Sequence, residues 1–151
     1  MMSASNGSTV VTYAYDYMGR MFSKVKNGAE TKYIWDGYNI IAELSSGTTN
    51  YNVWGLDLSG TMQGAGGVGG LLCVVQNGED YYPCFDGNGN VTEYVDSDGT
   101  VVAHYEYDPF GGITVASESK ADDFTHRFST KPWDGDTGLV EYELRDHSSL
   151  S

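Results

Sequence analysis

Apolar and polar residues alternate with a period of two along most of the chain. Stretches such as TYAYD at 12–16 and HYEYD at 104–108 place an aromatic ring at every second position before an Asp. Successive side chains of a β-strand point to opposite faces of a sheet, so this alternation predicts strands with one packed face. Val, Thr, Tyr and Trp are frequent in these stretches, and their preference for strands supports the same assignment.

The alternating stretches are near copies of one another. Each ends in Asp and then Gly; the copies are TYAYDYMGR at 12–20, KYIWDGYNI at 32–40, YNVWGLDLSG at 51–60, YPCFDGNGN at 82–90 and HYEYDPFGG at 104–112. Because Asp followed by Gly or Pro is typical of turns, each unit should be strand, turn and strand. In each unit, the Asp would accept backbone hydrogen bonds in the turn and the Gly would allow a positive φ.

Short hairpin turns should connect the units. Asn27-Gly28, Asn77-Gly78 and Asp98-Gly99 each lie between alternating stretches and predict hairpin turns, and Ser45–Thr49 fits a slightly longer loop. A helical period is absent, with the possible exception of 116–124, which is polar enough to be a loop. The predicted fold is all-β, an antiparallel meander of hairpins in a twisted sheet with little or no helix.

The expected domain organisation is simple. A chain of 151 residues is the size of one domain with one core. We expect a disordered or flexible N-terminus at 1–11, a single β domain at 12–145 and a flexible tail at 146–151.

Charge limits the partners that the protein can have. The formal net charge is -13, so the surface should repel nucleic acid and anionic lipid. No run of apolar residues is long enough to span a membrane as a helix, and the first residues do not resemble a signal peptide. We therefore expect no nucleic acid partner and no membrane insertion.

The two cysteines flank a predicted hairpin, LLCVVQNGEDYYPC. A two-residue turn at Asn77-Gly78 would place Cys73 opposite Tyr82, whereas a four-residue loop would place it opposite Cys84, where a disulfide could form. Both registers are open from the sequence.

The order of these motifs resembles the RHS and YD-repeat proteins. FDGNGNVTEYVDSDGTVVAHYEYDPFG at 85–111 is similar to late repeats of the RHS core, HRFSTKPWDGDTGL at 126–139 to the segment that follows them, and WGLDLSGTMQGAGGVGGLL at 54–72 is also typical of the family. The resemblance implies a strip of antiparallel sheet that, in full-length relatives, spirals into a shell around a C-terminal toxin or other cargo. It also implies a bacterial protein that is secreted or displayed at the cell surface.

This chain departs from the family pattern in three respects. It holds few repeats, which would be too little sheet to enclose a cargo. After Leu139 it reads VEYELRDHSSLS, where relatives continue with a Gly-Tyr-Arg-Tyr-Tyr stretch. It also lacks the downstream motif at which relatives cleave themselves.

Acid catalysis is the main alternative to a structural role. Aspartic peptidases use two carboxylates that share a proton, with the sequence Asp-Thr-Gly or Asp-Ser-Gly. Asp136-Thr137-Gly138 has these residues, but it follows Trp133-Asp134-Gly135 and not an apolar strand, and the same residues would also suit a turn. Asp57, Asp96 and Asp98 are weaker candidates for a second carboxylate, and turn capping is the alternative for them.

Metal and cofactor sites are not expected. Asp86, Asn88 and Asn90 alternate oxygen ligands, but Val91 and Ser97 occupy the positions that a calcium-binding EF-hand loop fills with Gly and Glu. His104, His126 and His147 lack the spacing of zinc ligands. The glycine-rich segment at 60–70 lacks the Lys-Ser or Lys-Thr pair of a phosphate loop, which favours a flexible or tightly turning connection.

Three functions remain open from the sequence. The first is a YD-repeat scaffold that presents an acidic, aromatic-rich sheet to a protein or glycoprotein partner, with a possible homodimer through the sheet edges. The second is an aspartic-type endopeptidase that uses Asp136. The third is a carbohydrate-binding module with Trp35, Trp54 and Trp133 as exposed anchors, although core packing is the alternative for these rings.

Overall fold

The fold is a long antiparallel meander, seen in a computed structural model that describes residues 2–6, 8–142 and 145–148. Within these residues an 11-stranded sheet runs in chain order, and a 3-stranded sheet follows it. The strands are β1 Met2–Asn6, β2 Thr9–Tyr15, β3 Met21–Lys26, β4 Ala29–Asp36, β5 Asn39–Ser45, β6 Thr48–Trp54, β7 Leu71–Gln76, β8 Glu79–Phe85, β9 Val91–Val95, β10 Val101–Tyr107 and β11 Ile113–Ser117, then β12 Trp133–Asp134, β13 Leu139–Tyr142 and β14 Arg145–Ser148.

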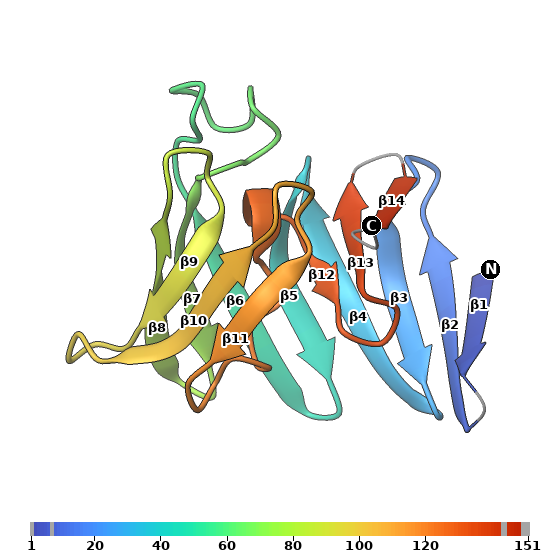
Figure 1. Cartoon of the computed structure of the whole chain (residues 1–151). Helices are drawn as coiled ribbons and strands as arrows, with labels where there is room; N and C mark the ends of the chain where they lie inside the picture. Colours follow the sequence, from blue (N-terminus) through green and yellow to red (C-terminus); the bar gives the residue numbers. More distant parts are fainter. Residues whose placement is uncertain (1, 7, 143–144, 149–151) are drawn as a thin grey trace.

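The predicted all-β antiparallel meander is confirmed. Every neighbouring pair from β1 to β11 is antiparallel, and the sheet is curved and twisted (Figure 1). Helical structure in the described residues amounts to one 3₁₀ turn at Phe128–Thr130. None of the described residues form a helix long and apolar enough to cross a membrane.

The expected boundaries differ from the observed strands at both ends. β1 lies in the segment expected to be flexible and pairs with β2 along its whole length. β14 likewise enters the expected C-terminal tail, because 146–148 pair with β13. Residues 149–151 of that tail lie outside the described residues. The alternating strand signal is weak in both segments, where Ser, Asn, Asp and His replace the aromatic residues.

Two-residue turns join the strands along the lower edge of the sheet (Figure 1). The turn at Asn27-Gly28 follows the pair Lys26–Ala29, and Asn77-Gly78 follows Gln76–Glu79, as predicted. Ser46-Gly47 is also a two-residue turn, shorter than the loop expected from the sequence. Positive φ at both central residues explains the Asn-Gly preference of these turns.

The register of the β7–β8 hairpin separates the two cysteines. Val74 pairs with Tyr81, as the two-residue turn requires, and Cys84 pairs with Glu93 on the next strand. Both cysteines are free thiols. The register that would have allowed a disulfide is therefore not adopted.

Five turns share the pattern Asp-x-x-Gly and begin at Asp16, Asp57, Asp86, Asp96 and Asp108. At Asp108, Oδ1 accepts hydrogen bonds from the backbone N–H groups of Phe110 and Gly112, both at 2.8 Å. Gly111 has φ +87°, and a Cβ at this position would lie 2.7 Å from the Phe128 ring. The expected roles of Asp and Gly are confirmed in the units that contain Asp16, Asp57, Asp86 and Asp108, where the carboxylate satisfies turn amides and glycine allows the left-handed backbone. The Asp36 unit differs, because Asp36 pairs with Asn39 across a two-residue turn in which Tyr38 N donates to Gln63 Oε1.

One of these turns replaces a predicted two-residue turn. The sequence indicated Asp98-Gly99 as the two central residues of a hairpin. The structure instead has a longer turn in which Asp96 accepts from Gly99 and donates to Thr100 through the backbone. The side chain of Asp96 favours this longer turn, because Oδ1 accepts from the N–H groups of Asp98 and Thr100.

A ring near the end of a strand links one repeat to the preceding repeat. The indole N–H of Trp35 donates to the Met21 carbonyl at 2.8 Å, and that of Trp54 donates to the Ile40 carbonyl at 2.8 Å. Tyr107 donates in the same way to the Val91 carbonyl at 2.5 Å. Met21 and Val91 are the first residues of β3 and β9, and Ile40 is the second residue of β5. These bonds therefore set the spacing of one unit against the next as well as burying the rings.

The C-terminal part of the chain crosses the hollow side of the sheet. After β11 it contacts β10 through Lys120 N–H and the Val102 carbonyl, then β5 through Thr125 and Glu43, and it reaches β3 where Asp134 meets Lys24. We call residues 118–134 the crossing segment. It adds Ala121 and Phe124 to the larger core cluster, in which residues of β7 to β10 are buried.

We predict that Tyr107→Phe lowers the free energy of unfolding by about 1 kcal/mol, because it removes one largely buried hydrogen bond and keeps the ring. Urea denaturation followed by fluorescence measures this change. Tyr17→Phe is the matched control, since Tyr17 is 95% exposed in its turn and should show no measurable change. Equal effects in the two variants would contradict the link between repeats.

Candidate functional site

The Asp136 carboxylate lies in the turn of the β12–β13 hairpin and faces two lysines. Its Oδ2 is 2.7 Å from Lys24 Nζ, and its Oδ1 is 2.5 Å from Lys26 Nζ. Lys24 also contacts Asp134 Oδ1 at 2.6 Å, and the Tyr13 hydroxyl donates to Asp134 Oδ2 at 2.6 Å. We call these residues, Tyr13, Lys24, Lys26, Asp134 and Asp136, the lysine–carboxylate cluster.

Electrostatics keep the cluster in its charged form. Burial by itself would raise the pKa of Asp136, but the ammonium groups of Lys24 and Lys26 outweigh it and lower that pKa below its usual value. Burial would lower the pKa of Lys24, but Asp134 and Asp136 raise it overall. Burial and the neighbouring Asp134 raise the pKa of Tyr13. The cluster is therefore a set of ion pairs and a neutral phenol at neutral pH.

This geometry does not match the carboxylate pair of a peptidase. Such a pair shares one proton, and one of its two carboxyl groups has a raised pKa. Asp134 does lie beside Asp136, but a lysine ammonium bridges the two carboxylates. Asp136 lies in an exposed turn, as the turn interpretation of Asp136-Thr137-Gly138 expects, and lysine ammonium groups contact both of its carboxylate oxygens. The cluster joins β2 and β3 to the β12–β13 hairpin, which lies more than 100 residues later in the sequence.

Asp57 holds the glycine-rich loop that precedes β7. Its carboxylate accepts hydrogen bonds from Ser59 N and Oγ, from Ala65 N at 2.7 Å and from Gly67 N at 3.1 Å. Burial would raise the pKa of Asp57, but these donors lower it to about 2. The carboxylate is thus committed to its own loop, and the glycines at 60–70 form a tightly turning connection.

Asp96 and Asp98 lie in a turn at the opposite end of the strands from the Asp57 loop (Figure 1). Asp96 accepts the two turn amides described above, and Asp98 is exposed. The oxygen ligands considered for calcium at 86–90 belong to another Asp turn, in which Asp86 accepts from Asn88 and Asn90. Within the described ranges, no group of three His, Cys, Asp or Glu side chains could hold a metal ion.

The histidines occupy separate environments. His104 lies on the strand surface between Glu93 and Glu106, and these partners raise its pKa. His126 is buried with its ring 5.3 Å from that of Trp54, and burial lowers its pKa to about 3. His147 lies in β14.

The three tryptophans pack inward. Trp35 and Trp54 donate to backbone carbonyls as described, and the Trp133 ring lies under the Arg127 guanidinium at 4.0 Å. They belong to the packing of the sheet and the crossing segment. The exposed anchors expected for a carbohydrate-binding module are therefore not formed by these rings.

The structure reveals a buried arginine that the sequence did not single out. Arg127 is 2% exposed. Its guanidinium lies 4.7 Å from the centre of the Tyr105 ring and also contacts the Trp133 ring. Its Nε donates to the Phe124 carbonyl at 3.0 Å, and its Nη2 donates to the Ala121 carbonyl at 2.9 Å. Ring faces and carbonyls thus compensate the buried charge.

Backbone bonds attach the crossing segment directly to the sheet. Val91 N donates to the Arg127 carbonyl at 3.0 Å, and the Tyr94 hydroxyl donates to the His126 carbonyl at 2.7 Å. Phe124 stacks on Tyr94 with ring centres 3.8 Å apart. Through these contacts and Arg127, the crossing segment covers the inner face of the 11-stranded sheet. The structure is therefore a β scaffold with one face of its sheet covered.

Comparison with known proteins identifies the family to which this chain belongs. The teneurin YD-shell family matches residues 1–150, and the chain belongs to that family. Two curated relatives are each 31% identical over 93% of this chain: the tRNA3(Ser)-specific nuclease WapA of Bacillus spizizenii and the tRNA nuclease WapA of Bacillus subtilis strain 168. The chain spans about 6% of the length of these relatives. The suspected kinship with RHS and YD-repeat proteins is confirmed.

Solved structures show the same fold. The crystal structure of TcdB2-TccC3-TEV matches 99% of this chain with a TM-score of 0.67 and 18% identity, over 8% of that chain. The Tc holotoxin pore of Photorhabdus luminescens matches 97% of this chain with a TM-score of 0.65 and 18% identity, also over 8% of its chain. The likeness shows that the segment folds as a strip of YD-repeat shell.

We predict that Asp136→Asn lowers the free energy of unfolding at pH 7 by about 2 kcal/mol, because it removes a carboxylate that contacts two lysines. The folded-state pKa of Asp136 is depressed, so its stabilisation is fully present above the ordinary pKa of 3.8 and is lost as pH falls through the folded value. The difference between wild type and variant should therefore shrink below pH 4.

Denaturation curves measured from pH 7 to pH 2 test this dependence. The exposed Asp98 provides the control, because Asp98→Asn removes the same charge outside the cluster. A difference between wild type and Asp136→Asn that does not change with pH would contradict the ionised cluster.

Proposed function

We propose that this protein works as a segment of structural wall whose outer surface is available to a protein or glycoprotein partner. The observation that carries this proposal is the crossing segment. It covers the hollow side of the sheet with Phe124, Arg127 and Trp133, so the outer side is left for contacts with other molecules. Exposed apolar side chains on the strands, such as Ile34 at 47%, Tyr51 at 53% and Val53 at 47%, support this assignment.

The sheet edges offer a second route to association. β1 and β11 end the ladder within the described residues, and backbone groups of an edge strand can pair with another strand. A homodimer through these edges remains a prediction. A secreted or cell-surface location follows from the family resemblance and forms part of the same proposal.

The proposal is tested by loosening the crossing segment. Phe124 is 2% exposed and stacked on Tyr94, so Phe124→Ala should lower the free energy of unfolding by about 3 to 5 kcal/mol. Limited proteolysis should then cut within 118–134 faster than in wild type. Both effects are expected together, because the segment and sheet share one core.

Phe110→Ala is the matched control, since Phe110 is 67% exposed in the Asp108 turn and should change neither quantity. A Phe124→Ala protein with released segment and unchanged sheet stability would contradict the proposal. It would show that the sheet holds its shape without an inner cover.

A further inference from the structure

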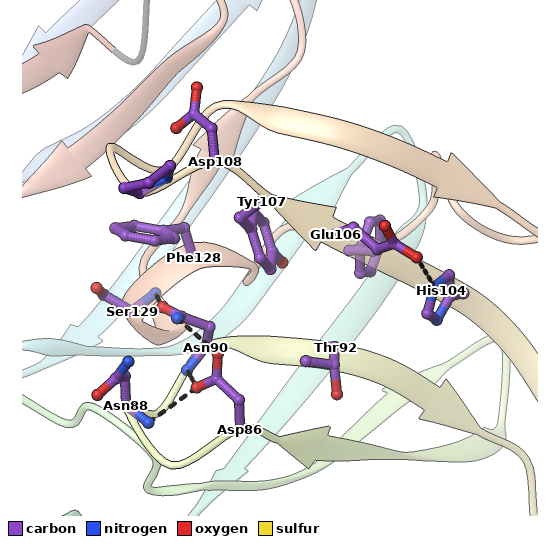
Figure 2. Close-up of a pocket in the computed structure, with 12 residues that line it drawn as sticks. Asp86, Asn88, Asn90, Thr92, His104, Glu106, Tyr107, Asp108, Phe128 and Ser129 are labelled. Carbon is purple, nitrogen blue, oxygen red and sulfur yellow. Dashed lines mark hydrogen bonds and ion pairs between the residues drawn. The ribbon is translucent and has the colours of Figure 1, made fainter.

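The strands β9 and β10 separate at one end and leave a cleft between them. Their ladder runs from the pair Val95–Val101 to the pair Glu93–His104, while β9 continues back to Val91 and β10 continues to Tyr107. At this end Val91 N donates to Arg127 of the crossing segment. Ser129 N, in the same segment, donates to Asn90 Oδ1 at 2.8 Å. The 3₁₀ turn at Phe128–Thr130 thus lies between the separated strands (Figure 2).

The cleft combines an aromatic base with a polar border. It has a volume of about 570 Å³, and its lining includes the rings of Tyr107 and Phe128, the carboxylates of Asp86, Glu106 and Asp108, and the side chain of Asn88. The rings of Tyr107 and Phe128 meet edge to face with centres 5.5 Å apart. Figure 2 shows them between the Asp86 and Asp108 turns.

Two of the three carboxylates keep oxygen atoms outside the bonds that build the fold. The turn amides bind Oδ1 of Asp108, and His104 Nε2 contacts Oε1 of Glu106 at 3.2 Å. Asp108 Oδ2 and Glu106 Oε2 take no part in those bonds. Asp86, in contrast, uses both oxygens for its own turn, with Asn90 Nδ2 donating to Oδ2 at 2.8 Å.

Positive charge is segregated away from this cleft. All eight Lys and Arg residues of the chain lie outside 33–119, the stretch that supplies most of the lining, while Asp and Glu occur throughout it. Lysine and arginine are also absent from the residues that line the cleft. The two cationic side chains of the crossing segment nearest in sequence, Arg127 and Lys131, are buried and bonded elsewhere. His104 also lines the cleft, and Glu106 and Glu93 raise its pKa, but it adds at most one positive charge against the carboxylates of Asp86, Glu106 and Asp108. The field at the cleft is therefore negative and favours a cationic ligand.

We propose that the cleft binds an arginine side chain of a basic protein partner. The planar guanidinium would stack on the Phe128 ring and donate to the carboxylates of Glu106 and Asp108. A side chain with one delocalised charge and an apolar stem suits an aromatic base with acidic groups at its border. The inference rests on the proposed function and names the class of partner that the outer surface receives.

The experiment measures binding of an acetylated Arg-Gly repeat peptide by isothermal titration at two salt concentrations. The same peptide with citrulline in place of arginine keeps the shape and removes the charge. Three variants each raise the net charge by one: Glu106→Gln removes a carboxylate of the cleft, Asn88→Lys places an ammonium at its border, and Asp98→Asn alters an exposed turn outside it.

The proposal predicts that Glu106→Gln and Asn88→Lys each weaken binding of the arginine peptide by about tenfold, whereas Asp98→Asn changes it less than about twofold. The citrulline peptide should bind at least about tenfold more weakly than the arginine peptide. Equal weakening in all three variants would reveal attraction by overall charge and overturn the proposal. Equal binding of the two peptides, or binding of a neutral oligosaccharide but not of arginine, would also overturn it.

Thermal unfolding of each variant separates this proposal from the scaffold function. Asn88, Glu106 and Asp98 are exposed, so all three variants should unfold close to wild type. Absent peptide binding in a protein that keeps its stability and its protected crossing segment would refute the arginine site and leave the scaffold intact. Loss of stability in Phe124→Ala bears on the scaffold alone.

Discussion

The structure depends on the burial of one ring per repeat against the same side of the sheet. A ring that reaches the backbone carbonyl of the preceding unit, as Trp35, Trp54 and Tyr107 do, satisfies a polar group while it adds apolar contact. The Asp turns that follow Trp54 and Tyr107 reverse the chain, and their carboxylates accept hydrogen bonds from amides of the same turn or loop. Ring and turn together explain why near copies recur, since each copy repeats one solution to the same packing problem.

A sheet with rings on one side still has to cover them, and here the chain supplies its own cover. Arg127 lies between Tyr105 and Trp133 at the centre of that cover, while Phe124 stacks on Tyr94. The lysine–carboxylate cluster fixes the far end of the crossing segment to β2 and β3. Asp136, the candidate catalytic residue from the Asp-Thr-Gly sequence, therefore connects the β12–β13 hairpin to β3. Asp57 likewise has a structural role, because its carboxylate binds the amides of its own loop.

Local chemistry explains which features the sequence could predict. Period-two alternation indicated the strands, and the Asn-Gly pairs and the Asp and Gly of HYEYDPFGG indicated turns, because each signal lies within a few residues. The contacts between Lys24 and Asp134, 110 residues apart, carry no such signal. The burial of Arg127 could not be predicted from the sequence either, because arginine is mostly exposed in proteins. The predicted two-residue turn at Asp98-Gly99 is wrong, because the Asp96 carboxylate accepts hydrogen bonds from the amides of Asp98 and Thr100 and so stabilises a longer turn.

Hydrogen exchange of the intact wild-type chain tests most directly whether sheet and crossing segment form one wall. The amides of Arg127, Thr130 and Trp133 are all bonded to backbone carbonyls. The account predicts that they exchange as slowly as the amides of β9 and β10 and lose protection together with them as denaturant is added. Fast exchange of these three amides while β9 and β10 stay protected would contradict it, because the segment would then lie loosely on an independently stable sheet.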